Sequence, residues 1–282
     1  MKQLTKVLLL LIPAVLFLTV IWLVVGGREP EDVTGPGIAY LEALEQKDPG
    51  AVDQFLRDRR QAELEAQREE LLRQVREDEL DPFTLFQDAV IMGDSRAQGF
   101  WYFGYVDESR TLTGAGHTIL DIANQMDILE EMNPQYIYLC YGLNDVKIGF
   151  WGSVDRYVTR YMEYVAQIRE RMPGAVVVIS STLPYLEDHD NDAEEIRQDP
   201  EREENAELDR MIQIPAWNEA LAKACAENDV IFVDNTAICE EHEDLWELDG
   251  IHVKKPFYSL WGKNLVVAAL AEGSTQVEEI DS

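Results

Sequence analysis

The sequence predicts an α/β protein with three layers, in which helices cover both faces of a parallel sheet of five strands. Three observations favour this class. Short runs rich in β-branched residues recur between residues 89 and 233, and stretches with helical periodicity separate them. The runs are apolar at consecutive positions, which is typical of strands that are buried on both faces. In such a sheet an active site lies at the carboxyl ends of the strands.

Strand and helix alternate along the chain, as in a doubly wound fold. The strands are expected at residues 89–92, 110–112, 136–140, 175–179 and 230–233. The helices are expected at residues 119–131, 154–172 and 212–228, with a last one after Pro256. We assign residues 85–282 to this α/β domain.

The composition of the 282-residue chain supports a folded domain and excludes several classes of partner. Apolar residues make up 46% of the chain, above the range of disordered sequences. The 54 acidic and 24 basic residues give a net charge of −30, which repels phosphate backbones, so nucleic acid is not an expected partner. Cys140, Cys225 and Cys239 are expected to be free thiols, with Cys140 in a buried strand.

An apolar stretch near the start of the chain predicts a membrane anchor. Residues 7–25 are nineteen consecutive uncharged residues, which as a helix span about 28 Å, close to the thickness of a bilayer core. Two lysines precede the stretch and three acidic residues follow it, which places the amino terminus in the cytoplasm. We therefore expect residues 1–26 to form a cytoplasmic tip and a transmembrane signal anchor, with the rest of the chain outside the cytoplasm. A cleaved signal peptide is the alternative.

Residues 27–84 are expected to form a linker and a charged helical stalk. The linker is rich in glycine and proline, whereas residues 38–80 are rich in Ala, Leu, Glu, Gln and Arg. Asp48 and Pro49 are placed to begin the second helix of this stalk. Its apolar residues recur irregularly, which favours a spacer packed on the α/β domain, with a coiled-coil dimerisation helix as the alternative.

An acidic insertion, residues 187–209, interrupts the alternation of strands and helices. It holds twelve acidic residues against two arginines and almost nothing apolar. We expect a mobile surface segment that buries no core. A calcium site is the alternative, but the carboxylates lack the Asp-x-Asp-x-Asp-Gly spacing. No metal and no other cofactor is expected.

Chemically reactive side chains follow the first, third and last predicted strands. Ser95 ends a Gly-Asp-Ser block where a helix begins, and by itself it fits a helix N-cap. Asn144, in Gly-Leu-Asn-Asp, is a turn residue or a neutral donor suited to an oxyanion. Asp249 and His252 lie three residues apart, so both fit one side of a single turn. A carboxylate beside an imidazole is the pair that activates a serine, so the four residues together favour nucleophilic catalysis.

These three blocks, in this order, resemble those of the SGNH or GDSL hydrolase family, and the likeness covers roughly residues 85–272. The resemblance implies a flavodoxin-like α/β/α fold and ester-type acyl transfer without a metal. It implies that Ser95 is the nucleophile, His252 the general base and later the acid, and Asp249 the carboxylate that orients His252. The chain departs from the family at Arg96, where many members carry an apolar residue.

The resemblance also implies an oxyanion hole. Its donors would be the backbone amides of Ser95 and Gly116 and the side chain of Asn144. Gly116 is chosen because Gly116-His117-Thr118 resembles the family's Gly-x-Thr. Gly114 is the alternative.

Several other polar and aromatic residues are interpreted without a catalytic role. Asp94 and Asp145 are expected to brace the strand-end turns by accepting backbone hydrogen bonds. No role is assigned to the remaining histidines, His117, His189 and His242. Four aromatic residues follow Ser95 and either line a substrate cleft or pack as core: Trp101, Tyr102, Phe103 and Tyr105.

Anchor and resemblance together imply a membrane-anchored, extracytoplasmic bacterial esterase or acyl transferase. Its expected substrates are small acyl esters, above all acetyl esters, of cell-envelope carbohydrate. One alternative is a lipid esterase or lysophospholipase at the membrane surface. The other is a non-catalytic module for envelope assembly or carbohydrate binding. The expected partners are an acylated carbohydrate or other small ester and the membrane, and the sequence identifies no protein partner.

Overall fold

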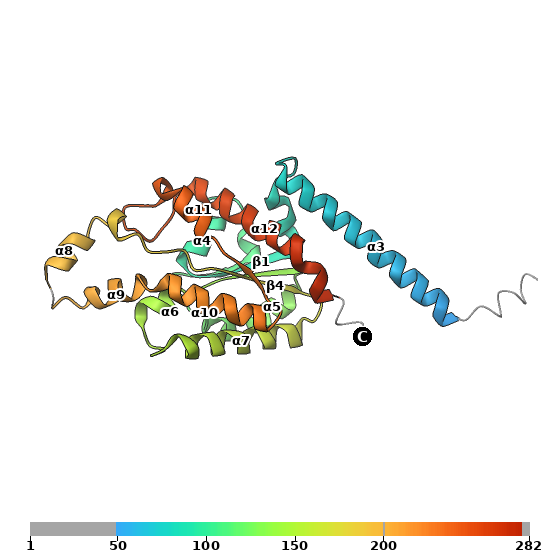
Figure 1. Ribbon diagram of the computed structural model, residues 1–282, viewed down its shortest axis with the longest axis horizontal. Coiled ribbons are helices and arrows are strands. Elements are labelled where there is room, and N and C mark those ends of the chain that lie inside the picture. The colour runs from blue at the N-terminus through green and yellow to red at the C-terminus, as the bar shows by residue number, and fades with distance from the viewer. Residues whose placement is uncertain (1–48, 200, 278–282) are drawn as a thin grey trace, which may run out of the picture. The chain divides into compact units, whose positions relative to one another are not determined.

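The computed structural model describes residues 49–199 and 201–277 of the 282-residue chain (Figure 1). The predicted anchor and most of the predicted linker lie outside the described residues. Within the described part, no helix is both long enough and apolar enough to cross a membrane. The chain divides into two compact units, Met1–Glu63 and Leu64–Ser282.

The charged helix α3 is Pro49–Arg76. The predicted cap residue, Asp48, lies outside the described residues. Its apolar side chains before residue 65 are exposed, and exposed pairs such as Arg59 with Glu63 line its surface. In the second unit, Leu71, Leu72 and Val75 instead pack against the core of the α/β domain. The second compact unit, Leu64–Ser282, therefore holds this end of α3 together with the sheet.

The prediction of a five-stranded parallel sheet is confirmed, and its strand order is β2-β1-β3-β4-β5. The strands are β1 Ala89–Gly93, β2 Thr111–Thr113, β3 Tyr136–Cys140, β4 Val176–Ser180 and β5 Ile231–Val233. Their ends differ from the predicted ones by one residue at most. Gly93 pairs with both Thr113 and Cys140, so the carboxyl ends of the three strands β2, β1 and β3 share one register row.

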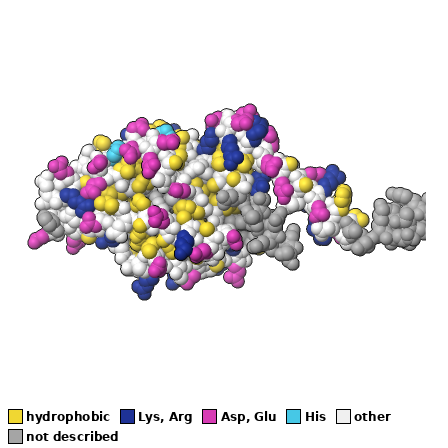
Figure 2. Space-filling view, in the orientation of Figure 1, with side chains coloured by type: hydrophobic (Ala, Val, Ile, Leu, Met, Phe, Trp, Pro, Cys, Tyr) yellow, Lys and Arg dark blue, Asp and Glu magenta, His cyan; other side chains and the backbone are white. Residues whose placement is uncertain are grey.

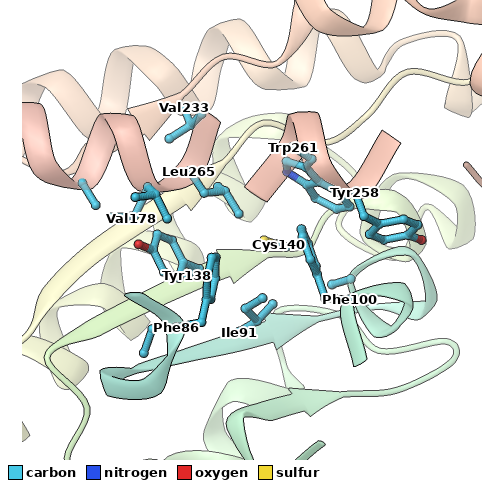
Figure 3. Close-up of a cluster of buried hydrophobic side chains, with 14 of the residues drawn as sticks. Phe86, Ile91, Phe100, Tyr138, Cys140, Val178, Val233, Tyr258, Trp261 and Leu265 are labelled. Carbon is cyan, nitrogen blue, oxygen red and sulfur yellow. The ribbon is translucent and has the colours of Figure 1, made fainter. Parts of the chain in front are cut away.

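Two helical layers cover the sheet. Alternate strand residues point to opposite faces, so Ile91 and Tyr138 enter one buried cluster while Val90 and Ile137 enter the other. The first face, shown in Figure 3, is covered by α4 Ser95–Tyr102, α11 Thr236–Glu241 and α12 Lys255–Val277. The second face is covered by α5 Asp121–Met132, α7 Val154–Arg171 and α10 Ile214–Glu227. Because both faces are covered, β1, β3 and β4 are buried at consecutive positions, whereas the edge strand β2, Thr111–Thr113, is half-buried.

Short helices complete the described part of the chain. They are η1 Pro82–Asp88, η2 Glu108–Arg110, α6 Leu143–Ile148, η3 Glu187–His189, α8 Ala193–Gln198, α9 Glu204–Met211 and η4 Glu243–Leu245. All three cysteines are free and buried, as predicted.

The expectation that the acidic insertion buries no core is wrong. Ala193, Ile196 and Leu208 are buried in a third apolar cluster. Ala193 and Ile196 lie three residues apart on α8, so they share one helix face. The other half of the cluster comes from α6, through Leu143 and Val146. A few well-spaced apolar residues therefore fold this segment in spite of its charge.

Candidate active site

Ser95 is the first residue of α4, directly beyond the carboxyl end of β1. The N-cap of this helix is Asp94, whose Oδ1 accepts a hydrogen bond of 2.9 Å from the Arg96 amide. Asp94 thus accepts a backbone hydrogen bond as predicted, and the alternative in which Ser95 serves only as the cap is wrong. A Cβ on Gly93 would lie 2.4 Å from the Cys140 carbonyl oxygen, so the turn into α4 requires glycine there.

Arg96 is buried beneath the turn that carries Ser95. Its Nη1 donates a 2.7 Å hydrogen bond to the Leu183 carbonyl, and its Nε lies 3.8 Å from Asp94 Oδ1. The hydroxyl of Tyr258 donates to the Arg96 carbonyl at 2.9 Å. A charge is tolerated at this position because the buried carboxylate of Asp94 compensates it.

Ser95, His252 and Asp249 form a continuous chain of polar contacts. Ser95 Oγ lies 3.0 Å from His252 Nε2, and His252 Nδ1 lies 2.6 Å from Asp249 Oδ2. Because an ionised carboxylate only accepts hydrogen bonds, Nδ1 carries the proton and Nε2 offers its lone pair to the serine hydroxyl. This is the arrangement that a general base needs.

Asp249 is held ionised by its surroundings. Its partial burial would raise the pKa of the carboxyl, but hydrogen bonds from the His252 side chain and from the His252 and Ile251 amides outweigh this effect and lower the pKa. Both amide contacts are 2.9 Å long. The side chains of His252 and Asp249 are 42% and 48% exposed, so this part of the site is open to solvent.

The structure distinguishes the two candidate glycines of the oxyanion hole. The Gly114 amide donates to the Gly93 carbonyl at 3.2 Å and so is already engaged. The Gly116 amide has no hydrogen-bond partner among the described residues, and its φ of +77° suits glycine. Because β2 is the neighbour of β1, the turn that carries Gly116 flanks the turn that carries Ser95.

Asn144 lies near the start of α6, after β3, which is the neighbour of β1 on the side opposite to β2. One N–H of its side chain donates to the His117 carbonyl at 2.9 Å. An amide group has two N–H donors, and the other makes no hydrogen bond within the described part of the chain. Asn144 is therefore positioned by the Gly116–Thr118 turn and keeps a donor available.

Asp145 ties the same two turns together. Its buried carboxylate accepts from the Ile119 amide at 3.2 Å and from Trp151 Nε1 at 3.0 Å, which confirms its predicted bracing role. Burial raises its pKa to about 7, although these two hydrogen bonds oppose the shift.

A cavity of about 490 Å³ opens beside Ser95 and His252. Trp101, Tyr102 and Phe103 line it, which confirms the cleft interpretation for three of the four aromatic residues. Tyr105 instead packs against Phe83 with the two rings tilted, their centroids 4.7 Å apart.

Sequence reasoning missed three further residues that line this cavity: Gln98, Glu247 and Tyr258. Gln98 lies one helical turn beyond Ser95, which is the signal that could have found it. Glu247 and Tyr258 reach the site through tertiary packing. Across the described residues, no group of three His, Cys, Asp or Glu side chains could hold a metal ion.

Comparison with known proteins agrees with this site. A family model described as GDSL-like lipase/acylhydrolase matches residues 91–258, a range that contains Ser95, Asn144, Asp249 and His252. A search of the curated proteins gives no match.

The fold is found in a solved structure. A Bacteroides fragilis protein described as an acylhydrolase superposes with a TM-score of 0.50 at 18% identity, over 66% of this chain and 87% of its own. A GDSL-like lipase of Bacteroides thetaiotaomicron gives a TM-score of 0.48 at 18% identity, over 66% and 88% of the two chains. A variant of Axe2, an acetylxylan esterase from Geobacillus stearothermophilus, gives 0.45 at 12% identity, over 64% and 92%.

Proposed function

Because the chain belongs to the GDSL-like lipase/acylhydrolase family and is therefore an ester hydrolase, we propose that it cleaves small acyl esters of carbohydrate with Ser95, His252 and Asp249 as its catalytic triad. The observation that carries this proposal is the contact chain from Ser95 Oγ through both nitrogens of His252 to Asp249 Oδ2. An intact chain of this kind also argues against a non-catalytic module.

The first half of the reaction transfers the acyl group to the enzyme. His252 Nε2 takes the proton of Ser95 as Oγ attacks the ester carbonyl carbon. The negative charge that develops on the carbonyl oxygen is stabilised by the amides of Ser95 and Gly116 and by the free N–H of Asn144. Asp249 stabilises the imidazolium. The intermediate collapses when His252 gives its proton to the departing alcohol oxygen, which leaves an acyl ester on Ser95.

The second half repeats these steps with water. His252 Nε2 takes a proton from water as the water oxygen attacks the acyl carbon, and the same donors hold the oxyanion. The bond to Ser95 Oγ then breaks, Oγ regains the proton from His252, and the carboxylic acid leaves. A saccharide hydroxyl in place of water would give acyl transfer.

The cavity beside Ser95 supports a saccharide ester over a long-chain lipid ester. Tyr102 is 71% exposed at its edge, and an exposed ring offers an apolar face to the C–H groups of a sugar. Gln98 and Glu247 supply hydrogen-bonding groups in the same wall. Long acyl chains need a deep apolar channel. The overall charge of −30 also disfavours anionic lipid surfaces, and acidic side chains are spread over the face shown in Figure 2.

Labelling with a fluorophosphonate and turnover of 4-nitrophenyl acetate test the triad. We expect Ser95→Ala to lose both the labelling and the turnover without unfolding, because the substitution removes only a hydroxyl that faces the cavity. Ser259→Ala, at an exposed position of α12, is the matched control and should keep both. Full turnover by the Ser95→Ala protein would refute the triad.

A series of 4-nitrophenyl esters from C2 to C12 tests the acyl group. We expect kcat/KM to fall steeply beyond about four carbons, because the cavity measures only about 490 Å³ and Gln98 and Glu247 interrupt its aromatic wall. Added methylenes therefore recover little of the about 0.8 kcal/mol that full burial of each would give. Values that rise towards C8–C12 would favour the lipid esterase. Release of acetate from acetylated oligosaccharides, compared with acetylated glycerol, then tests the alcohol half of the substrate.

We further propose that residues 7–25 anchor the protein with its α/β domain outside the cytoplasm, where the substrate would be envelope carbohydrate. The support is the length of the uncharged stretch and the lysines before it. Protease added to spheroplasts should digest the domain. Protection of the domain, or release of a protein that begins near Gly27, would contradict the anchored arrangement.

A further inference from the structure

The acidic insertion, residues 187–209, contacts the loop that carries Asp249 and His252. The Asn191 amide donates to the Leu248 carbonyl at 3.0 Å, and the Leu186 amide, just before the insertion, donates to the Gly250 carbonyl at 2.9 Å. Asp190 forms an antiparallel bridge with Asp249. A Cβ on Gly250 would lie 2.3 Å from the Leu186 carbonyl oxygen, so the two segments touch through their backbones.

The apolar side of the insertion reaches both halves of the site. Ile196 and Leu208 lie in one buried cluster with Leu143 of α6, and Ile251 packs against that cluster. Leu143 directly precedes Asn144, and Ile251 directly precedes His252. One cluster therefore supports the proposed oxyanion donor and the proposed general base.

Polar contacts hold the insertion on α6 and close it on itself. Arg210 Nε, just beyond the insertion, donates to the Lys147 carbonyl in the last turn of α6 at 2.6 Å. Within the insertion, Arg197 bonds Glu187 at 2.6 Å and Asp209 at 2.7 Å. Arg197 thus joins the two ends of the insertion.

We propose that the insertion is a positioning element that holds the Asp249–His252 loop in register with Asn144, with Ile196 and Arg197 as its positioning residues. The proposal rests on the proposed triad. His252 and Asp249 are half-exposed and do not directly follow a strand, so the sheet alone does not fix them. A displacement of about 1 Å at such a site costs about 100-fold in rate, and the insertion supplies the missing support.

Ile196→Ala tests the proposal by opening a cavity in the shared cluster. We expect kcat for 4-nitrophenyl acetate and the rate of fluorophosphonate labelling to fall together by about 10-fold or more, with KM within about 2-fold. Ile212→Ala, the same change at a residue 50% exposed just after α9, is the matched control and should match the wild type. Equal rates for the two variants would overturn the proposal.

A second pair tests the clamp within the insertion. Arg197→Met should lower kcat in the same way as Ile196→Ala. Arg202→Met is its control, because the ion pairs of Arg202 among the described residues are with Glu195 and Glu204 in the middle of the insertion, so Arg202 does not join its two ends. If both arginine variants lower kcat equally, the effect is one of general charge and the proposal is wrong.

An Asp249→Asn background separates positioning from general destabilisation. If Ile196 acts through the Asp249–His252 loop, adding Ile196→Ala to the Asp249→Asn protein should lower kcat by less than about 2-fold further. If Ile196→Ala lowers kcat as strongly in this background as in the wild type, the role of Ile196 is merely structural. Thermal melting of each variant checks that the folded fraction is unchanged at the assay temperature. Undiminished activity of the Asp249→Asn protein itself would instead refute the triad, so the two failures are distinguishable.

Discussion

Ser95 and Asn144 follow buried strands within four residues, whereas Asp249 and His252 lie on a loop between η4 and α12. The carboxylates beside the first pair, Asp94 and Asp145, are 1% and 0% exposed, but the side chain of Asp249 is 48% exposed. We call these the nucleophile side and the acid–base side. On the nucleophile side, chemistry and folding depend on the same buried groups. On the acid–base side they are separable, so substitutions there should change rates more than stability.

The largest rate effect is expected on the acid–base side. Asp249→Asn should lower kcat by about 10³–10⁴-fold, because an amide N–H facing His252 Nδ1 favours the tautomer whose Nε2 carries the proton. The melting temperature should change little, since Asn keeps an oxygen for the Ile251 and His252 amides. Asp244→Asn, an exposed position in the nearby η4, is the control. Activity above a tenth of the wild type would remove Asp249 from the triad.

On the nucleophile side, Asn144→Ala should lower kcat by about 10²–10³-fold with little change in KM, because an oxyanion donor acts mainly in the transition state. Steady-state hydrolysis of 4-nitrophenyl acetate measures this effect. Asn124→Ala, at an exposed position of α5, should behave as the wild type. A change of less than about 3-fold would show that Asn144 only supports the His117 carbonyl.

The largest stability effect is expected beneath Ser95. Asp94→Ala removes an N-cap and leaves the buried Arg96 without its carboxylate, which should cost about 3–5 kcal/mol of unfolding free energy. Asp107→Ala removes an N-cap from the exposed η2 and should cost much less, because solvent replaces the lost contact. Urea denaturation compares the two. If the two variants lose equal free energy of unfolding, the buried groups of the nucleophile side do not contribute more to stability than exposed ones.

The two sides should also respond to pH with opposite signs. Burial raises the pKa of Asp145 from 3.8 to about 7, so between about pH 4 and 7 the unfolded state releases this proton while the folded state keeps it, and stability falls as the pH rises. The pKa of Asp249 is lowered, so its contribution is present above pH 3.8 and is lost as the pH falls below that value. In melting curves from pH 3 to 7.5, the melting temperature of Asp145→Asn should therefore rise relative to that of the wild type between pH 4 and 7. The melting temperature of Asp249→Asn, which lies only slightly below that of the wild type at neutral pH, should meet it below pH 4. Parallel curves would refute both assignments.

The same contrast explains what the sequence predicted. The strands carry their signal locally, in consecutive β-branched residues, and a serine or asparagine just past a strand end is placed by the strand itself. Asp249 and His252 were recognisable from their spacing of three residues. The contact between His252 and Ser95 Oγ depends on the path of a loop, which only the structure supplies.

What the sequence could not predict depends on partners far along the chain. The insertion is buried only because α6 offers Leu143 and Val146 to it. The choice between Gly114 and Gly116 depends on which amide the Gly93 carbonyl engages, and no side chain encodes that. Val75 ends a charged helix, yet it is fully buried against the α/β domain.

The smallest expected effect lies at the entrance between the two sides, at Tyr102. Its ring lines the cavity that contains Ser95 and His252 but is 71% exposed, so it supports neither the fold nor the triad. If the ring stacks on the sugar, Tyr102→Ala should raise KM for an acetylated oligosaccharide several-fold, because a stacked aromatic contact is worth about 0.5–1.5 kcal/mol. The kcat and the turnover of 4-nitrophenyl acetate should not change, since neither depends on the sugar. Tyr102→Phe keeps the ring and should restore KM, which separates stacking from hydrogen bonding by the hydroxyl. A loss of activity on both the oligosaccharide and 4-nitrophenyl acetate would show instead that Tyr102 supports the position of Ser95. The wall of the cavity would then belong to the nucleophile side.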